Sequence, residues 1–169
     1  MNSNETDIAI VSNPNPQQIA SIAMQASATN RQVNVSSFDV TSDRGRIMLV
    51  KATLMDCKPL KDLVNLDINI TDYYIHPASS EETNGEIEEF NRVVVFDDKG
   101  EAYQCAARGV IKSLAVLTYA RGSLPFDPPI KCTVKLKDIG GAKQWLTLIP
   151  DLHSLSPEVK RPPTKAAKG

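Results

Sequence analysis

The segment NRVVVFDDKGEAYQCAA, residues 91–107, constrains the fold more strongly than any other stretch of the chain. Two apolar runs flank Asp98, Lys99 and Gly100, and a glycine supplies the positive φ that a tight connection between strands demands. This pattern is typical of a β-hairpin. The sequence therefore predicts an antiparallel pair of strands in the second half of the chain.

Three earlier segments have the composition of strands. Residues 31–40 (RQVNVSSFDV) and 45–55 (GRIMLVKATLM) are rich in β-branched and apolar residues, and the polar, turn-like TSDR separates them. Residues 65–75 (NLDINITDYYI) predict a half-buried strand, because their apolar residues alternate with other residues. The alternating residues of this strand are Leu66, Ile68 and Ile70. Residues 57–64 (CKPLKDLV), which precede it, are expected to form a loop with one helical turn.

Two segments predict helices. PQQIASIAMQASAT begins near Pro16, and its apolar residues at positions 19, 22, 23 and 26 share one side. ARGVIKSLAVLTYAR, residues 107–121, has an apolar stripe at spacings of three and four, and Gly122 and Pro125 mark its end. The stripe consists of Val110, Ile111, Leu114, Ala115, Leu117 and Thr118.

Strands dominate this pattern and no βαβ alternation occurs. We therefore expect a mainly β fold, a small antiparallel barrel of OB type with one covering helix, plus a short N-terminal helix. Residues 1–15 are expected to be a flexible leader, 16–150 the OB-like domain and 151–169 a flexible basic tail. The tail carries Lys160, Arg161, Lys165 and Lys168.

Charge and cysteine content exclude several classes of protein. The formal net charge is −1, so a polyanionic partner has to be met by a local basic patch. The widely spaced Cys57, Cys105 and Cys132 are expected to be reduced core residues, and the solitary His76 and His153 have no metal-ligand spacing. No catalytic motif, metal site or cofactor is expected. The absence of a long apolar run predicts a cytoplasmic protein with no membrane partner, in the host cytoplasm if the source is viral.

Residues 130–149, IKCTVKLKDIGGAKQWLTLI, carry the most informative charge pattern. Ile130, Cys132, Val134 and Leu136 alternate with polar residues, because successive strand residues point to opposite faces. The opposite face carries Lys131, Thr133, Lys135 and Lys137. If the next strand places Leu146 and Leu148 inside, Trp145 lies on the outer face beside Lys135 or Lys137. Cations beside an exposed ring suit single-stranded nucleic acid, because lysines neutralise phosphates and rings stack on bases.

Two alternatives stay open at this point. The lysines serve solubility and deter edge pairing, or a register shifted by one residue turns Trp145 into the core. A half-buried position with its hydroxyl in water is the alternative for each tyrosine.

The segment HPASSEETNGEIEEF, residues 76–90, predicts an exposed acidic loop in a long hairpin.

The order of these features resembles the small single-stranded DNA-binding proteins of protein-primed, phi29-like phages. The similarity covers about residues 60–150 and rests on a strand ending in tyrosine, the acidic loop, VVVFDDKGEAYQCAARGVIKSLAVL and the lysine-bearing final hairpin. In that family, proteins with an OB fold coat displaced template strands without sequence preference, and tyrosines stack on bases. The family's tyrosines fall on Tyr74 or Tyr73 and on Tyr103. A third family tyrosine has no counterpart in the acidic loop, which leaves His76 or Trp145 to substitute for it, or a weaker site.

The resemblance implies a non-enzymatic protein that coats and protects displaced strands during phage DNA replication. Its partners are single-stranded DNA and, as candidates, DNA polymerase or other replication proteins, and it is monomeric or self-associates weakly along DNA. The alternative function is a non-catalytic protein-interaction or structural β-barrel module. The candidate DNA-binding residues are Tyr73, Tyr74, Arg92, Tyr103, Lys131, Lys135, Lys137, Lys143 and Trp145.

Overall fold

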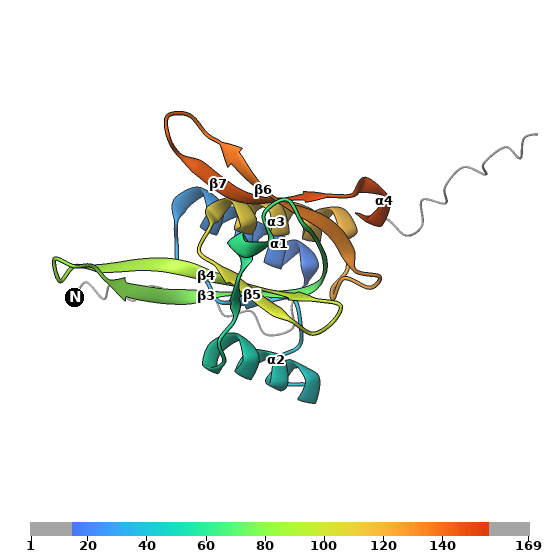
Figure 1. Cartoon of the computed structure of the whole chain (residues 1–169). Coiled ribbons are helices and arrows are strands. Elements are labelled where there is room, and N and C mark those ends of the chain that lie inside the picture. The colour runs from blue at the N-terminus through green and yellow to red at the C-terminus, as the bar shows by residue number, and fades with distance from the viewer. Residues whose placement is uncertain (1–14, 156–169) are drawn as a thin grey trace, which may run out of the picture.

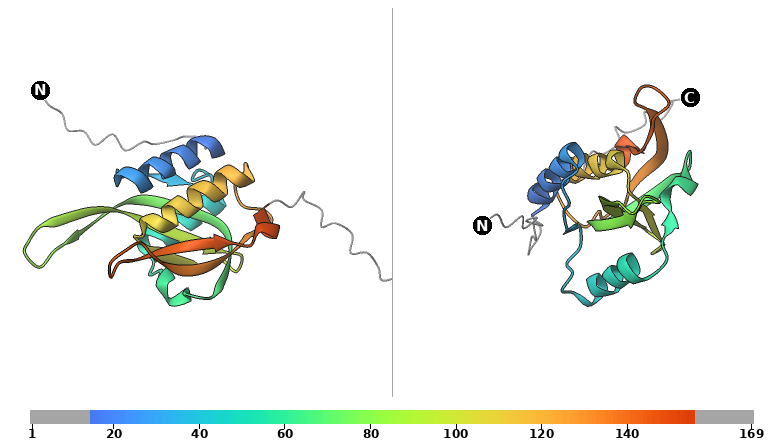
Figure 2. Two further views of the ribbon diagram at one scale, coloured as in Figure 1. Left: turned by 90° about the horizontal axis from the view of Figure 1, so that it is seen from above. Right: turned by 90° about the vertical axis from the view of Figure 1, so that its left-hand side faces the viewer.

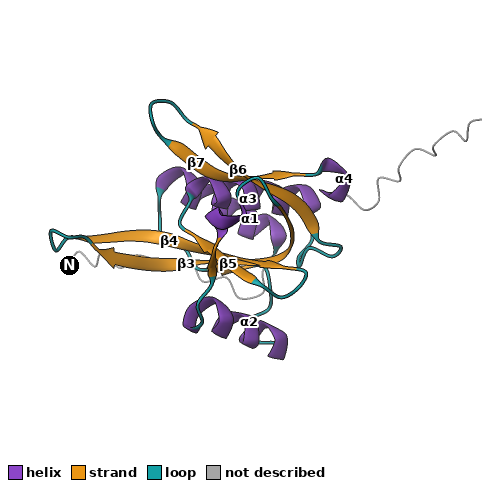
Figure 3. Ribbon diagram, in the orientation of Figure 1, coloured by secondary structure: helices purple, strands orange, loops and turns teal. Residues whose placement is uncertain are grey.

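The structure is a computed structural model that describes residues 15–155, and it has a curled sheet between two helical layers (Figure 1, Figure 3). None of the helices in this range is long and apolar enough to cross a membrane. The helices are α1 (Pro16–Thr29), α2 (Asp43–Leu54), the 3₁₀ helix η1 (Leu60–Leu63), α3 (Arg108–Arg121) and α4 (Leu152–Leu155). The strands are β1 (Val35–Ser36), β2 (Lys58–Pro59), β3 (Asp67–Glu81), β4 (Ile87–Asp97), β5 (Ala102–Cys105), β6 (Ile130–Asp138) and β7 (Gln144–Pro150).

The strand order β2-β5-β4-β3-β6-β7 confirms the predicted fold class. All pairs are antiparallel except β2 with β5, and β1 pairs with β3 outside the main order. Strands β3 to β7 curl into a half-barrel, and α3 connects β5 to β6, as in a small OB-type barrel. Within residues 15–155 the sheet order ends at β7, so the barrel stays open between β5 and the β6–β7 hairpin.

The main core lies between the inner face of the sheet and the layer of α1 and α3 (Figure 2). Every residue of the predicted 107–121 stripe is buried there, and α1 begins at Pro16 as predicted. The predicted 91–107 hairpin is also present as β4 and β5. Gly100 takes φ +77° in its turn, a conformation that side chains with a Cβ atom rarely adopt.

The predicted strand at 45–55 is wrong, because this segment forms α2. The side chain of Ser42 caps the helix by accepting from Gly45 N, and a Cβ atom at position 45 would overlap the carbonyl oxygen of Asp39. Met48 and Ala52, one helical turn apart, are buried against the outer face of β3 and β4. The predicted strand at 31–40 is reduced to Val35–Ser36. Helices therefore cover both faces of the sheet, rather than one covering helix.

The acidic segment is exposed as predicted, but most of it is strand. β3 and β4 stay paired out to Glu81 and Ile87, so only a short turn separates them. We call residues 78–90 the acidic arm. Its base is held in place, because the side-chain amide of Gln32 donates to the carbonyl oxygens of Ala78 and Phe90, at 3.1 and 3.2 Å. The arm therefore projects from the sheet as a supported hairpin (Figure 1).

The C-terminal end of the described chain is tied to the domain. Residues 152–155 of the predicted tail form α4, and Arg121 donates to the carbonyl oxygens of Ser154 and Leu155 at 2.6 and 2.7 Å. The predicted leader, apart from Asn15, and the basic residues of the predicted tail lie outside the described residues.

Candidate nucleic-acid interface

The lysine-bearing strand β6 has the alternation expected from the sequence. Ile130, Cys132 and Val134 are buried, and Lys131, Lys135 and Lys137 are exposed. The alternation ends near the tip of the hairpin, where Leu136 is 46% exposed. β6 therefore belongs to the core at its base and to the surface at its tip.

Trp145 lies on the outer face of β7, directly opposite Lys137 in the strand register. Its side chain is 39% exposed, so the alternative that places the ring in the core is excluded. The guanidinium carbon of Arg108, in the first turn of α3, lies 5.9 Å from the centre of the indole ring. One aromatic ring therefore has cations from both β6 and α3 beside it.

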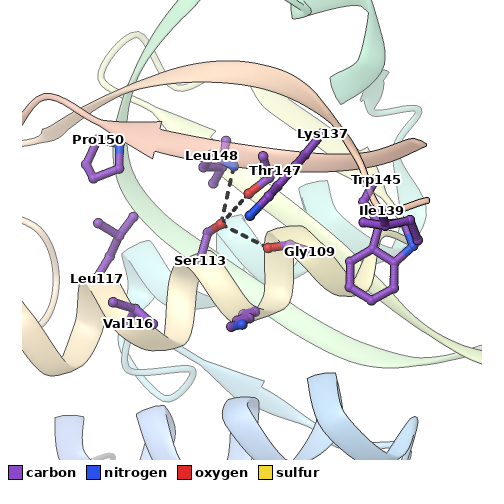
Figure 4. Close-up of a pocket in the computed structure, with 11 residues that line it drawn as sticks. Gly109, Ser113, Val116, Leu117, Lys137, Ile139, Trp145, Thr147, Leu148 and Pro150 are labelled. Carbon is purple, nitrogen blue, oxygen red and sulfur yellow. Dashed lines mark hydrogen bonds between the residues drawn. The ribbon is translucent and has the colours of Figure 1, made fainter. Parts of the chain in front are cut away.

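A groove of about 420 Å³ separates α3 from the β6–β7 hairpin. We call it the tryptophan groove; its lining includes Lys112, Ser113, Lys137, Ile139, Trp145 and Thr147 (Figure 4). Ser113 sets its floor, because its hydroxyl donates to the carbonyl oxygen of Gly109 and accepts from Leu148 N. The same hydroxyl lies 3.0 Å from that of Thr147. These bonds cover the free edge of β7 with α3 and fix the spacing of the two walls.

The lysines of β6 differ in how free their charges are. Lys131 pairs with Asp67 at 3.5 Å, and Lys135 donates to the side-chain oxygen of Asn65 at 3.0 Å. Lys137 takes part in none of the ion pairs found among residues 15–155, and Lys143 is exposed in the connection between β6 and β7. Positive charge available to a ligand is therefore concentrated toward the tip of the hairpin.

A second groove, of about 530 Å³, lies where the barrel is open. We call it the arginine groove; it is lined by side chains of β4, β5 and η1 and by the tip of the β6–β7 hairpin, including Lys61, Phe90, Arg92, Gln104, Leu136 and Gln144. Arg92 lies with its guanidinium carbon 6.0 Å from the centre of the Phe90 ring. The tip of the hairpin contributes residues to both grooves.

His76 supports Arg92 from the neighbouring strand. The two residues are partners in the β3–β4 register, and the imidazole stacks on Tyr74 with ring centres 4.9 Å apart. Burial, followed by the positive charge of Arg92, lowers the pKa of His76 below 6.5, against a hydrogen bond to the Pro77 carbonyl that raises it. Burial therefore favours the neutral form of the ring.

The tyrosines predicted to stack on bases are the main correction to the site. Tyr73 is fully buried, with its hydroxyl hydrogen-bonded to that of Thr118, so no face of the ring is open to a base. Tyr74 is 6% exposed and packs among Phe38 and the residues under α2. Tyr103 is half-buried against the main core. Adjacent strand residues point to opposite faces, and here both faces are covered at positions 73 and 74.

Several residues of the grooves were not among the predicted site residues. Phe90 and Gln104 line the arginine groove, and Arg108 and Lys112 lie beside the tryptophan groove. Three of these had a usable signal in the sequence: Phe90 lies on the same face of β4 as the predicted Arg92, and Arg108 and Lys112 are one helical turn apart. The closeness of α3 to β7 could not be read from either pattern.

A family model described as "Phage Single-stranded DNA-binding protein" matches residues 28–149. The chain belongs to this family. The match confirms the resemblance drawn from the sequence, and it extends further toward the N-terminus, because it begins at the end of α1 and includes α2. All residues that line the two grooves, apart from Pro150, lie inside the matched range. No curated protein and no solved structure matches the chain.

Proposed function

We propose that this member of the phage single-stranded DNA-binding family coats displaced strands during DNA replication without reading their sequence. The observation that carries the proposal is the half-exposed ring of Trp145, set between Lys137 and Arg108 in the tryptophan groove. An aromatic face with cations on two sides offers a base and its phosphates complementary contacts at one point.

Two kinds of contact explain why binding would not depend on sequence. Stacking of a base on Trp145 contributes about 1 to 3 kcal/mol and tolerates every base, because each base has a π-face. Lys137, Lys112 and Lys143 would neutralise phosphates, and each neutralised phosphate releases counterions whatever its base. This chemistry needs no cofactor and no catalytic group, in accord with a binding protein that is not an enzyme.

The arginine groove offers a second point of contact. Phe90 supplies a ring and Arg92 a guanidinium, both on the outer face of β4. The face of the second and third strands and the two hairpin loops beside it are where OB-type barrels take single strands, and here those are β4, β5, the acidic arm and the β6–β7 hairpin. We infer that the strand crosses the tip of the β6–β7 hairpin from one groove to the other.

The predicted site residues take different places in this proposal. Arg92, Lys137, Lys143 and Trp145 contact DNA, and Lys131 and Lys135 add charge at the base of the hairpin. Tyr74 stacks on His76, the partner of Arg92 in the β3–β4 register, and so helps to position it. Tyr103 lies in β5 next to Gln104, which lines the arginine groove. Tyr73 contributes to stability alone. The place of action would be the cytoplasm of the infected host, with DNA polymerase or other replication proteins acting on the same strand.

The proposal is tested by titrating oligo-dT, oligo-U and duplex DNA at two salt concentrations. Trp145 is the single tryptophan, so its fluorescence reports the groove directly. We expect quenching by oligo-dT and an affinity that falls steeply with salt. A protein-interaction or structural module would show neither, and that result would overturn the proposal.

Matched variants make the test specific to the site. Trp145→Ala should weaken oligo-dT binding by about 10- to 100-fold, the equivalent of stacking one base. Tyr119→Ala is the control, because Tyr119 is an aromatic residue that is 73% exposed on α3 away from the groove. Lys137→Ala should lower the salt dependence by about one counterion, and Lys99→Ala, in the exposed β4–β5 turn, should leave it unchanged.

A further inference from the structure

The helix α2 has a second apolar face that nothing in the described structure covers. Ile47, Val50 and Leu54 are 61%, 47% and 81% exposed, and their spacing of three and four places them in one stripe. Met48 and Ala52 already bury the other side of the helix against the sheet. A helix that is apolar on its solvent side as well is typical of a docking surface.

A hollow of about 270 Å³ lies at the edge of this stripe, between α2 and the β4–β5 turn. Ile47, Met48 and Phe96 supply apolar walls, and the Lys51 side chain lines it as well. Asp97 also lines the hollow, but its carboxylate accepts from the backbone N–H groups of Lys99 and Glu101 in its own turn. The hollow is therefore apolar within and cationic along the helix.

Positive charge borders the stripe on both sides. Arg46 lies one turn from Val50, and Lys51 lies one turn from Ile47. The guanidinium of Arg46 has only a loose contact with Asp43, at 3.8 Å, and is 67% exposed. Arg44 is different, because the buried carboxylate of Asp72 holds it at 2.6 Å. The surface therefore suits an apolar side chain that has carboxylate side chains as neighbours on either side.

The acidic arm presents that combination. Ile87 is 71% exposed, directly opposite Glu81 in the β3–β4 register, and Glu89 follows on the same face of the strand. None of the ion pairs found among residues 15–155 uses a glutamate of the arm. An exposed isoleucine between carboxylates is the complement of an apolar hollow beside Arg46 and Lys51.

We propose that the acidic arm of one molecule docks on the α2 face of a second copy, with Ile87 at the hollow and its glutamates toward Arg46 and Lys51. Contact within one chain is disfavoured, because Gln32 and Asn91 hold the base of the arm while the arm extends away from α2 (Figure 1). Arm and helix are different surfaces, so the contact is heterologous and repeats from molecule to molecule. It would link neighbours on a DNA strand.

The contact between copies does not depend on DNA, so sedimentation velocity of the full chain alone at low salt tests it. Glu81→Arg and Arg46→Glu should each weaken self-association by about tenfold, the effect of turning an attractive pair into a repulsive one. The double variant restores the pair and keeps the net charge of −1, so its association should return to within about threefold of the original.

Replacing exposed apolar residues provides an independent test of the contact. Ile87→Ser should weaken association without any change in charge. Leu152→Ser is the control, because Leu152 is 75% exposed but lies in α4, outside the proposed contact. A chain that stays monomeric at all concentrations, or single reversals that leave association unchanged, would overturn the inference.

Binding to DNA is measured separately, so that the two proposals fail separately. On oligo-dT that holds one molecule, Arg46→Glu, on α2 and outside both grooves, should bind as the unmodified chain does, whereas on poly-dT it should lose cooperativity. This cooperative step alone rests on the proposed function. A chain that binds no DNA but associates through these residues would overturn the proposed function and keep the contact.

Discussion

A Cβ atom built on Gly109 would lie 2.5 Å from the carbonyl oxygen of Leu146 and 3.6 Å from the indole ring of Trp145. The first turn of α3 thus touches the backbone of β7, and only a residue without a side chain permits it. We expect Gly109→Ala to lower the free energy of unfolding by about 1 to 3 kcal/mol, since the backbone has to shift. Urea denaturation followed by Trp145 emission measures both stability and the displacement of the ring. An equally stable variant with unchanged emission would contradict this close approach.

Replacing Tyr73 should alter stability and leave DNA binding intact. Its hydroxyl is fully buried and bonded to Thr118, whose own hydroxyl also bonds to the carbonyl oxygen of Leu114 at 2.8 Å. Tyr73→Phe therefore removes one hydrogen bond and leaves Thr118 satisfied, at a cost of about 1 kcal/mol. Thermal denaturation and an oligo-dT titration of the same variant check the two parts. A clear loss of affinity in a folded variant would return Tyr73 to the binding site.

Stability should fall as the pH drops below about 6.5, the pKa of an unfolded histidine. The pKa of His76 is lowered in the folded protein, mainly by burial, so between the two values the unfolded chain binds more protons than the folded one. The contribution of His76 is therefore complete above the unfolded pKa and is lost below it. The free energy of unfolding measured from pH 8 to pH 5 should decline more steeply for the unmodified chain than for His76→Gln.

The control for this pH dependence is His153→Gln, because His153 lies exposed in α4. This variant should keep the slope of the unmodified chain. Identical slopes for the unmodified chain and for His76→Gln would show that other groups cause the acid sensitivity.

The thiols should be inert in the native protein. All three cysteines are free; burial raises the pKa of Cys105 to about 11 and that of Cys132 to about 12, and it raises that of Cys57 as well. Since the thiolate is the reactive form, a disulfide reagent at pH 8 should react only slowly with the folded chain. In denaturant the same reagent should react readily with all three thiols. Fast reaction of one thiol in the folded protein would show that its surroundings open.

The sequence predicted the sheet better than it predicted the layer beneath it. The Gly100 turn and the stripe of α3 each depend on neighbours in sequence, and both are present. The alternation is present at Ile68 and Ile70 in β3 and up to Val134 in β6, but Leu66, predicted with the former pair, precedes β3 and is exposed. The segment GRIMLVKATLM was assigned to a strand because it is rich in β-branched and apolar residues. The apolar surplus is real, since α2 buries one side on the sheet and leaves another exposed, but composition alone did not reveal its period.

The site was predictable where it depends on one hairpin and not where it depends on tertiary contacts. The register of β6 and β7 places Trp145 opposite Lys137 as the pattern required. Tyr73 and Tyr74 failed as exposed stacking residues because α1, α3 and α2 cover the two faces of β3, and that covering comes from segments far away in the chain. Arg108 entered the site for the same reason, through the packing of α3 on β7.

The hydroxyl of Ser113 that binds Leu148 N has a consequence beyond the groove it shapes. An exposed edge strand can pair with the edge strand of another molecule. Proteins bound side by side on a polymer are at high local concentration, which favours such pairing. Because α3 packs along β7 and the hydroxyl of Ser113 accepts from Leu148 N, this edge of the sheet is covered against pairing with a second sheet. If the protein coats DNA as proposed, this covering would keep neighbouring molecules from joining their sheets at β7.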